Sequence, residues 1–105
     1  MAKQGVTVLF DQQATTATSN PTDFIEGDFV VHAFVAGTGA VTATVLWYGN
    51  TDKTNTNGVL IATSTLSGTT SDSTGAEIVC NWPYIYAVLS AISGTSAKVT
   101  ARVSA

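Results

Sequence analysis

The stretch "WPYIYAVLSAISGTSAKVTARVSA", residues 82–105, holds two strand-like runs on either side of a Ser/Gly/Thr turn. The second run alternates, and its apolar face carries Ala97, Val99, Ala101 and Val103. The first run has two apolar faces. One of them carries Ile85, Ala87, Leu89 and Ala91, and we expect it to pack into the core. The other carries Trp82, Tyr84, Tyr86 and Val88. An antiparallel strand with water on one side has a single apolar face, so the pattern predicts that something covers the second.

The same two-sided pattern recurs in "DFVVHAFVAG", residues 28–37, and in "ATVLWY", residues 43–48. Three such strands in one exposed sheet would form a larger apolar patch than soluble monomers usually tolerate. Either a closed barrel hides both faces within the chain, or another subunit covers the outer one. The loops of this short chain are polar, which favours the second explanation: an oligomer, or a protein attached to a larger assembly.

Short β-rich runs separated by turn residues dominate the chain, and helix signals are almost absent. We expect strands near 6–10, 29–35, 41–48, 59–66, 76–81, 84–92 and 97–103, with a shorter one near 24–26. The spacing predicts a single all-β domain over residues 1–105. Its fold class is an antiparallel β-sandwich, jelly-roll-like, with about seven or eight short strands.

Turn chemistry predicts how these strands connect. "AGTGA" at 36–40 and "SGTS" at 93–96 are short Gly turns that indicate hairpins. Residues 49–58 and 67–75 read as longer polar loops. The segment 11–23, "DQQATTATSNPTD", has no apolar side chain larger than alanine. It is either a surface loop or an arm that orders on a partner.

Composition excludes several classes of partner. Only 10% of the 105 residues are charged and the formal net charge is −3, which argues against nucleic acid and against an anionic membrane surface. No run is apolar and long enough for a membrane span, and residues 1–10 do not resemble a signal peptide. Thr and Ser make up roughly a quarter of the chain, which suits exposed strand faces. A single Cys excludes an internal disulfide.

Residues capable of catalysis or metal binding are isolated. His32 is the only histidine, so neither a His-based metal site nor a triad is expected. Cys80 shares a face with apolar neighbours and reads as a buried hydrophobe. Asp23, Glu26 and Asp28 cluster in "DFIEGD" without the ligand order of a calcium loop. We therefore expect a protein that is not an enzyme, with no catalytic residues, metal or cofactor.

Aromatic side chains offer a different route to function. Trp47 and Tyr48 end one run, while Trp82, Tyr84 and Tyr86 share one strand face. Such residues fill a sandwich core, form a subunit interface, or make a platform on which sugars stack.

In size and in the character of its segments the chain resembles the small β-sandwich decoration, or cement, proteins on the heads of tailed bacteriophages. The resemblance rests on a short first strand, "GVTVLF", a polar arm, Thr/Gly/Ala-rich strands, and the ending "AISGTSAKVTARVSA". It implies a jelly-roll-like sandwich that sits as a homodimer or homotrimer on the outer surface of the virion, assembled in the host cytoplasm. The implied partner is the major capsid protein, whose shell it stabilises.

The expected function is therefore that of a virion structural protein. Its candidate subunit or capsid contacts are Asp23, Glu26, Asp28, Trp82, Tyr84, Tyr86, Val88, Lys98 and Arg102. The alternative is a carbohydrate- or receptor-binding β-module of a phage tail fibre or spike, with Trp47 or Trp82 exposed for stacking.

Overall fold

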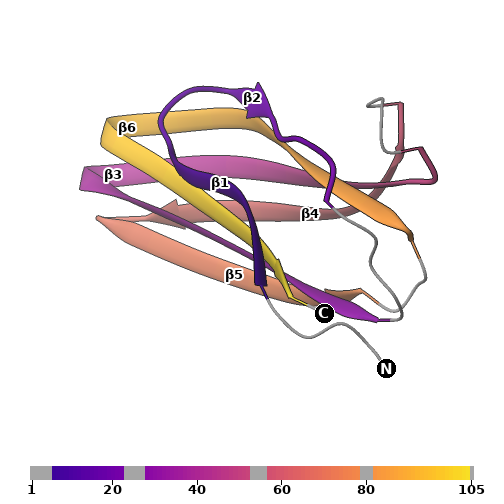
Figure 1. The fold of residues 1–105 in the computed structure, drawn as a ribbon. Helices are drawn as coiled ribbons and strands as arrows, with labels where there is room; N and C mark the ends of the chain where they lie inside the picture. The colour runs from indigo at the N-terminus through magenta and orange to yellow at the C-terminus, as the bar shows by residue number, and fades with distance from the viewer. Residues whose placement is uncertain (1–5, 23–27, 53–56, 79–81, 105) are drawn as a thin grey trace.

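The computed structural model describes residues 6–22, 28–52, 57–78 and 82–104 (Figure 1). It contains six strands and, over these residues, no helix. The strands are β1 (Val6–Gln13), β2 (Ala17–Thr18), β3 (Phe29–Asn50), β4 (Val59–Gly68), β5 (Ser71–Ile78) and β6 (Tyr84–Ser104). Because the described part of the chain has no helix, it has none that is long and apolar enough to cross a membrane.

Two of the strands are very long, and each contributes to both layers of a sandwich. The first layer has the order β1, C-terminal half of β6, N-terminal half of β3, β5. The second layer has the order β2, N-terminal half of β6, C-terminal half of β3, β4. All pairings are antiparallel. With β3 and β6 counted as two segments each, the eight segments follow jelly-roll order, which confirms the predicted fold class.

The sharp bends of β3 and β6 lie side by side at one end of the molecule (Figure 1). The bend of β3 contains Gly39, with a φ of 79°, and that of β6 contains Gly94, with a φ of 123°. Neither Gly turn closes a hairpin, so both predicted hairpins are wrong. At each bend the strand passes from one layer to the other, and the segments on either side pair with β6 or β3 instead of with each other.

The core lies between the layers and holds the residues that the alternation predicts. From the C-terminal half of β6 it takes Ala97, Val99, Ala101 and Val103, all buried. From the N-terminal half it takes Ile85, Ala87 and Leu89. Ala91 is exposed, contrary to the prediction. The ladder pairs Val45 with Leu89 and Thr44 with Ala91, so β6 has one extra residue between these two pairs. This irregularity turns the Ala91 side chain to the side of the sheet opposite Leu89.

Two predicted boundaries differ from the structure. The segment 67–75 is not a long loop, because β4 runs to Gly68 and β5 begins at Ser71. The carboxylate of Asp72 stabilises this tight connection, since it accepts the backbone N–H groups of Ser67 and Ser73, each at 2.9 Å. The predicted strand at 76–81 is the end of β5, and residues 79–81 lie outside the described ranges. The possible strand at 24–26 also lies outside them.

Candidate binding surfaces

The outer face of the first layer carries apolar side chains that nothing in the described chain covers. Val6, Val8 and Val30 are 60%, 50% and 45% exposed. Val8 and His32 both pair with Arg102, one on each side of the C-terminal half of β6, so these side chains form one row across the layer. We call this surface, made of Val6, Val8, Val30, His32, Phe34 and Arg102, the valine face. The sequence pattern in residues 28–37 predicts a second face on this strand, and Val30, His32 and Phe34 form that face.

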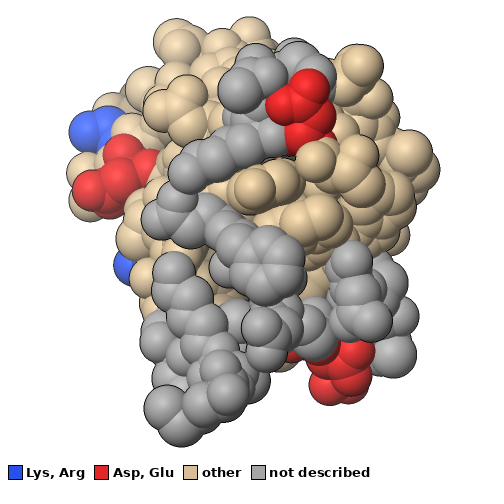
Figure 2. Space-filling view, turned by 45° about the vertical axis from the view of Figure 1, so that its right-hand side comes forward, with Lys and Arg blue, Asp and Glu red and all other residues tan. Residues whose placement is uncertain are grey.

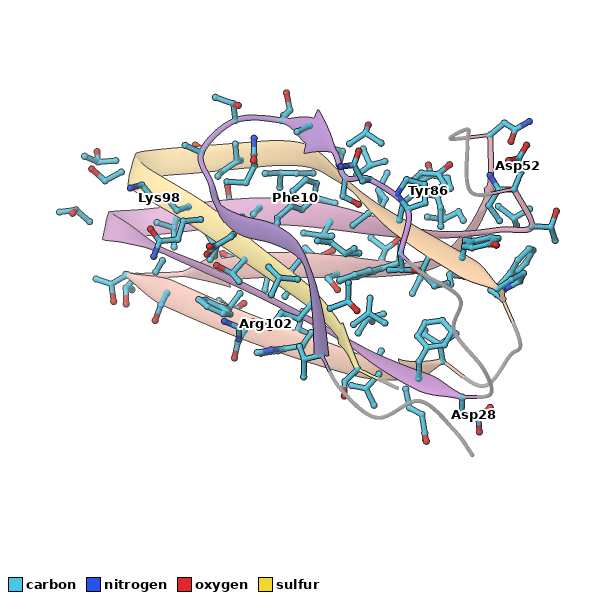
Figure 3. All side chains as sticks on the ribbon, in the orientation of Figure 1. Phe10, Asp28, Asp52, Tyr86, Lys98 and Arg102 are labelled. Atoms are coloured by element: carbon cyan, nitrogen blue, oxygen red, sulfur yellow. The ribbon has the colours of Figure 1, made fainter. Side chains whose placement is uncertain are left out.

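Both basic and acidic side chains occur on the same layer, and the exposed Glu77 is the ladder partner of Val30. Of the described residues only Lys98 and Arg102 are lysine or arginine, and both point outward from β6 (Figure 3). The Arg102 guanidinium carbon lies 5.5 Å from the centroid of the Phe34 ring, in a cation–π arrangement. His32 lies beside the same ring, with centroids 5.7 Å apart. The predicted contacts Lys98 and Arg102 thus border an apolar surface, and Arg102 is held in place on it.

A cavity of about 490 Å³ beside this face is lined by His32 and Phe34 on β3 and by Ser71, Asp72 and Ser73 on β5. Serine, histidine and aspartate together invite comparison with a hydrolase triad. In the ladder, however, Ser73 pairs with Phe34 and Asp72 pairs with Val35, so the Asp72 side chain leaves the opposite side of the strand. Both of its oxygens accept N–H groups of the β4–β5 connection. Asp72 therefore does not orient His32.

The predicted contact face at Trp82, Tyr84, Tyr86 and Val88 is covered in part by the chain itself. Tyr86 is only 1% exposed, so its assignment as a subunit contact is wrong. Its ring stacks on Tyr48 with centroids 5.1 Å apart, and its hydroxyl accepts the Gly58 N–H at 2.9 Å. The other three side chains are half-buried. The local sequence pattern does not predict that Tyr86 is buried, because the residues that contact it, Tyr48 and Gly58, lie 38 and 28 positions away in the chain.

The two tryptophans have opposite roles. Trp47 is fully buried between the layers, and its indole N–H donates to the Ser64 hydroxyl at 2.9 Å. It is not available for stacking, so that part of the alternative function is wrong. Trp82 is half-buried and lies over Gly49 at the end of the second layer.

The predicted acidic contacts are only partly placed. Asp28 is exposed just before β3, at the end of the molecule opposite Lys98 (Figure 3). Asp23 and Glu26 lie outside the described residues, as does Cys80. In the described part of the chain no group of three or more His, Cys, Asp or Glu side chains is arranged to hold a metal ion. Charged atoms are sparse on the side of the molecule shown in Figure 2, where most of the described surface belongs to other residues.

Ser19 and Thr22 have a structural role that the sequence pattern does not predict. The Ser19 N–H donates to the Ala87 carbonyl at 2.8 Å, and the Ser19 hydroxyl accepts the Ala87 N–H at 2.8 Å. Thr22 makes the same pair of bonds with Ile85, at 2.8 and 3.0 Å. The described part of the polar segment 11–23 thus lies along the edge of β6. The N–H groups of β6 donate there to hydroxyl oxygens, where a regular strand would offer backbone carbonyls. Alternation of side chains therefore does not predict that this segment pairs with β6.

Comparisons with known proteins support the fold. No protein-family model matches the chain, and no curated protein matches it in sequence. Among solved structures, it is similar to the K3 adhesin domain of Lys-gingipain from Porphyromonas gingivalis, with a TM-score of 0.50 and 7% identity over 95% of this chain and 73% of that one.

Two further structures are similar at lower scores. One is a pilus protein of Bacillus endospore appendages, with a TM-score of 0.46 and 18% identity, covering 96% of this chain and 83% of that one. The other is VP2 of infectious bursal disease virus, with a TM-score of 0.46 and 11% identity, covering 96% of this chain and 32% of that one. At such identities the likeness concerns the fold alone. Together with the strand order, the adhesin comparison confirms a β-sandwich domain.

Proposed function

We propose that this protein acts by binding: it is a capsid decoration protein that attaches to the outer surface of a bacteriophage head and stabilises the shell. The observation that carries the proposal is the valine face. Three exposed valines on one sheet form an apolar contact surface, and a stapling protein needs contact area rather than a cavity. A face of this kind, rimmed by polar side chains, is typical of protein interaction sites.

The charges on this face specify the kind of partner. Arg102 belongs to it and Lys98 borders it, while the exposed Glu77 lies beside Val30 as its ladder partner. A partner surface that is apolar, with an acidic residue opposite Arg102 and a basic residue opposite Glu77, complements these features. We assign the valine face to the major capsid protein.

Shell stabilisation follows from buried area and from linkage between copies. Each contact with a capsid subunit must be broken before the shell opens. A single contact of ordinary size spans a wide range of affinities, because the quality of the contact matters more than its area. Linking two or three copies raises the effective affinity, so a homodimer or homotrimer is the expected form.

The first test is binding to undecorated heads assembled from the major capsid protein of the phage that encodes this chain. The double variant Val8→Asp/Val30→Asp is expected to bind at least ~100-fold more weakly, because two carboxylates would replace apolar side chains at the centre of the contact and would have to lose their water there. Co-sedimentation with the heads measures this. Val59→Asp is the matched control, since Val59 is 56% exposed on β4, away from the valine face. Equal binding by the double variant and the native protein would contradict the proposal.

The second test concerns the oligomer. Sedimentation velocity of the native protein is expected to show a dimer or trimer at about 100 µM, the concentration range in which weak specific contacts are populated. The variant Val8→Asp/Val30→Asp should keep the same sedimentation coefficient, because its substitutions lie on the capsid-binding face. A monomeric native protein would refute the oligomeric form but leave the assignment of the valine face to be judged by head binding.

A further inference from the structure

A second cavity lies at the end of the molecule where β3 finishes and β4 begins. Its volume is about 450 Å³. Trp82 and Val59 line its apolar side, and Asn50, Thr51, Asp52 and Asn57 line its polar side. Asp52 marks this end in Figure 3, well away from Lys98 and Arg102. The valine face belongs to the other layer, so the proposed capsid contact does not use this cavity.

The indole of Trp82 is held flat by a glycine. A Cβ atom built on Gly49 would overlap the indole, and the three nearest atoms are Cγ, Cδ2 and Cε2, in the middle of the ring system. Gly49 therefore meets the face of the ring rather than its edge. The ring is half-buried by this contact, and its remaining surface lines the cavity. An aromatic platform fixed before binding loses little conformational entropy when a ligand stacks on it.

The polar wall is also held in shape. Asn50 is only 7% exposed, and its side-chain oxygen accepts the backbone N–H groups of Thr51 and Asp52 at 2.8 and 3.1 Å. Its side-chain amide donates to the Asn57 side-chain oxygen at 3.3 Å. These bonds fix the turn that carries the exposed side chains of Thr51, Asp52 and Asn57. The cavity thus presents hydroxyl, carboxylate and amide groups opposite a flat aromatic surface.

This combination matches one class of ligand. A hexopyranose with equatorial hydroxyls has ring faces of C–H groups, which carry partial positive charge and pair with the negative face of an indole. Its rim of hydroxyls both donates and accepts, as carboxylate and amide groups require. The volume falls in the range of small-molecule sites and fits one or two sugar units. Asp52 and the net charge of −3 disfavour phosphorylated or acidic ligands.

We propose that this cavity is a binding site for a neutral oligosaccharide, with one hexopyranose unit stacked on Trp82 and its hydroxyls hydrogen-bonded at the Asn50–Asp52 turn. Trp82 is the stacking residue, and Asp52 is the acceptor for ligand hydroxyls. Gly49 is a positioning residue, because it sets the plane of the indole. On a virion surface such a site would add attachment to a glycan-bearing surface to the structural role of the protein.

The test uses the full chain and three neutral probes: cellotetraose, tetra-N-acetylchitotetraose and lacto-N-neotetraose. In ¹H–¹⁵N spectra at least one probe is expected to give saturable shifts of the Trp82 indole N–H and the Gly49 and Gly58 amides. The signal of the Trp47 indole N–H, which is buried and donates to the Ser64 hydroxyl, should not shift. One stacking contact with a few hydrogen bonds corresponds to a Kd on the order of 1 mM. No saturation by any of the three probes at about 20 mM would overturn the proposal.

Substitutions then assign the site. Trp82→Ala is expected to weaken binding about tenfold or more, and Trp82→Phe, which keeps a ring, to weaken it less. The phenylalanine variant also serves if the alanine variant does not fold. Phe34→Ala is the matched control, since it removes an aromatic ring from the other layer and should leave the affinity unchanged. Binding that survives Trp82→Ala, or that falls equally with Phe34→Ala, would contradict the assignment.

The charge of the ligand gives an independent check. The sialylated form of lacto-N-neotetraose is expected to bind several-fold more weakly than the neutral form, and Asp52→Asn should narrow that difference. Equal or tighter binding of the acidic sugar would overturn the assignment of a neutral ligand. Because Val8→Asp/Val30→Asp alters only the valine face, it should bind oligosaccharide normally. Failure of the glycan site and failure of the capsid contact are therefore distinguishable.

Discussion

Replacing Trp47 with alanine is expected to lower the free energy of unfolding by about 3 to 5 kcal/mol, the range found when a large core aromatic is truncated. Trp47 is fully buried, and its indole N–H donates to the buried hydroxyl of Ser64. The variant would lose the apolar contacts of the indole and also leave that hydroxyl without its donor. Small domains have a total stability of only about 5 to 15 kcal/mol, so this variant should be close to unfolding at 37 °C.

Urea unfolding followed by circular dichroism measures this effect, and Trp82→Ala is the matched control. Both substitutions remove an indole, but Trp82 is half-buried at the end of the second layer, so a smaller loss of stability is expected. Trp47→Phe should fall between the two, because it keeps one ring in the core but loses the second ring of the indole and the hydrogen bond to Ser64. Equal losses for Trp47→Ala and Trp82→Ala would contradict the view that Trp47 is the central core residue.

Replacing Gly94 with alanine is expected to cost about 2 to 4 kcal/mol, because a side chain would be forced into a backbone conformation that only glycine adopts readily. Gly94 has a φ of 123°, and a Cβ atom there would lie 2.6 Å from the Ala40 carbonyl oxygen and 3.0 Å from Val41 Cγ1. Since β3 and β6 bend together at this point, relieving the contact would separate the two strands on which both layers depend.

Gly39→Ala is the control for this prediction. Gly39 also has a positive φ, 79°, but a Cβ atom added there meets nothing within 4 Å. Its expected cost is about 1 kcal/mol, from backbone conformation alone. Thermal and urea unfolding of the two variants separate the conformational cost from the steric one. A Gly94→Ala variant as stable as Gly39→Ala would show that the close approach of the two bends does not constrain the fold.

Side-chain alternation predicts burial best where one face of a strand meets the core. Val99 and Ala101 were predicted to be buried from alternation alone, and they are. The two Gly turns were identified correctly as turns but assigned to the wrong connection. A hairpin and a layer-to-layer bend both place apolar runs on either side of glycine, so periodicity does not distinguish them. The difference lies in the pairing partner, which is remote in sequence.

Some residues of the candidate sites can be predicted from the local sequence pattern, and others depend on distant segments. Lys98 and Arg102 could be predicted as surface residues from their positions opposite the apolar face. Tyr86 could not be predicted as buried, because Tyr48 and the Gly58 N–H, which cover it, come from other parts of the chain. The cavity at Trp82 depends on Gly49 and Asn50, which are more than 30 positions away. No local pattern connects them.

An all-β sandwich of low charge can be predicted from the sequence, because side-chain alternation and turn residues are local properties of the chain. The sequence also predicts that more apolar strand surface exists than one core can use. Only the tertiary structure decided which of that surface stays exposed. It covers Tyr86, buries Trp47 and leaves Val6, Val8 and Val30 open to solvent. The physical reason is that exposure of a strand's second face depends on which distant segment packs over it.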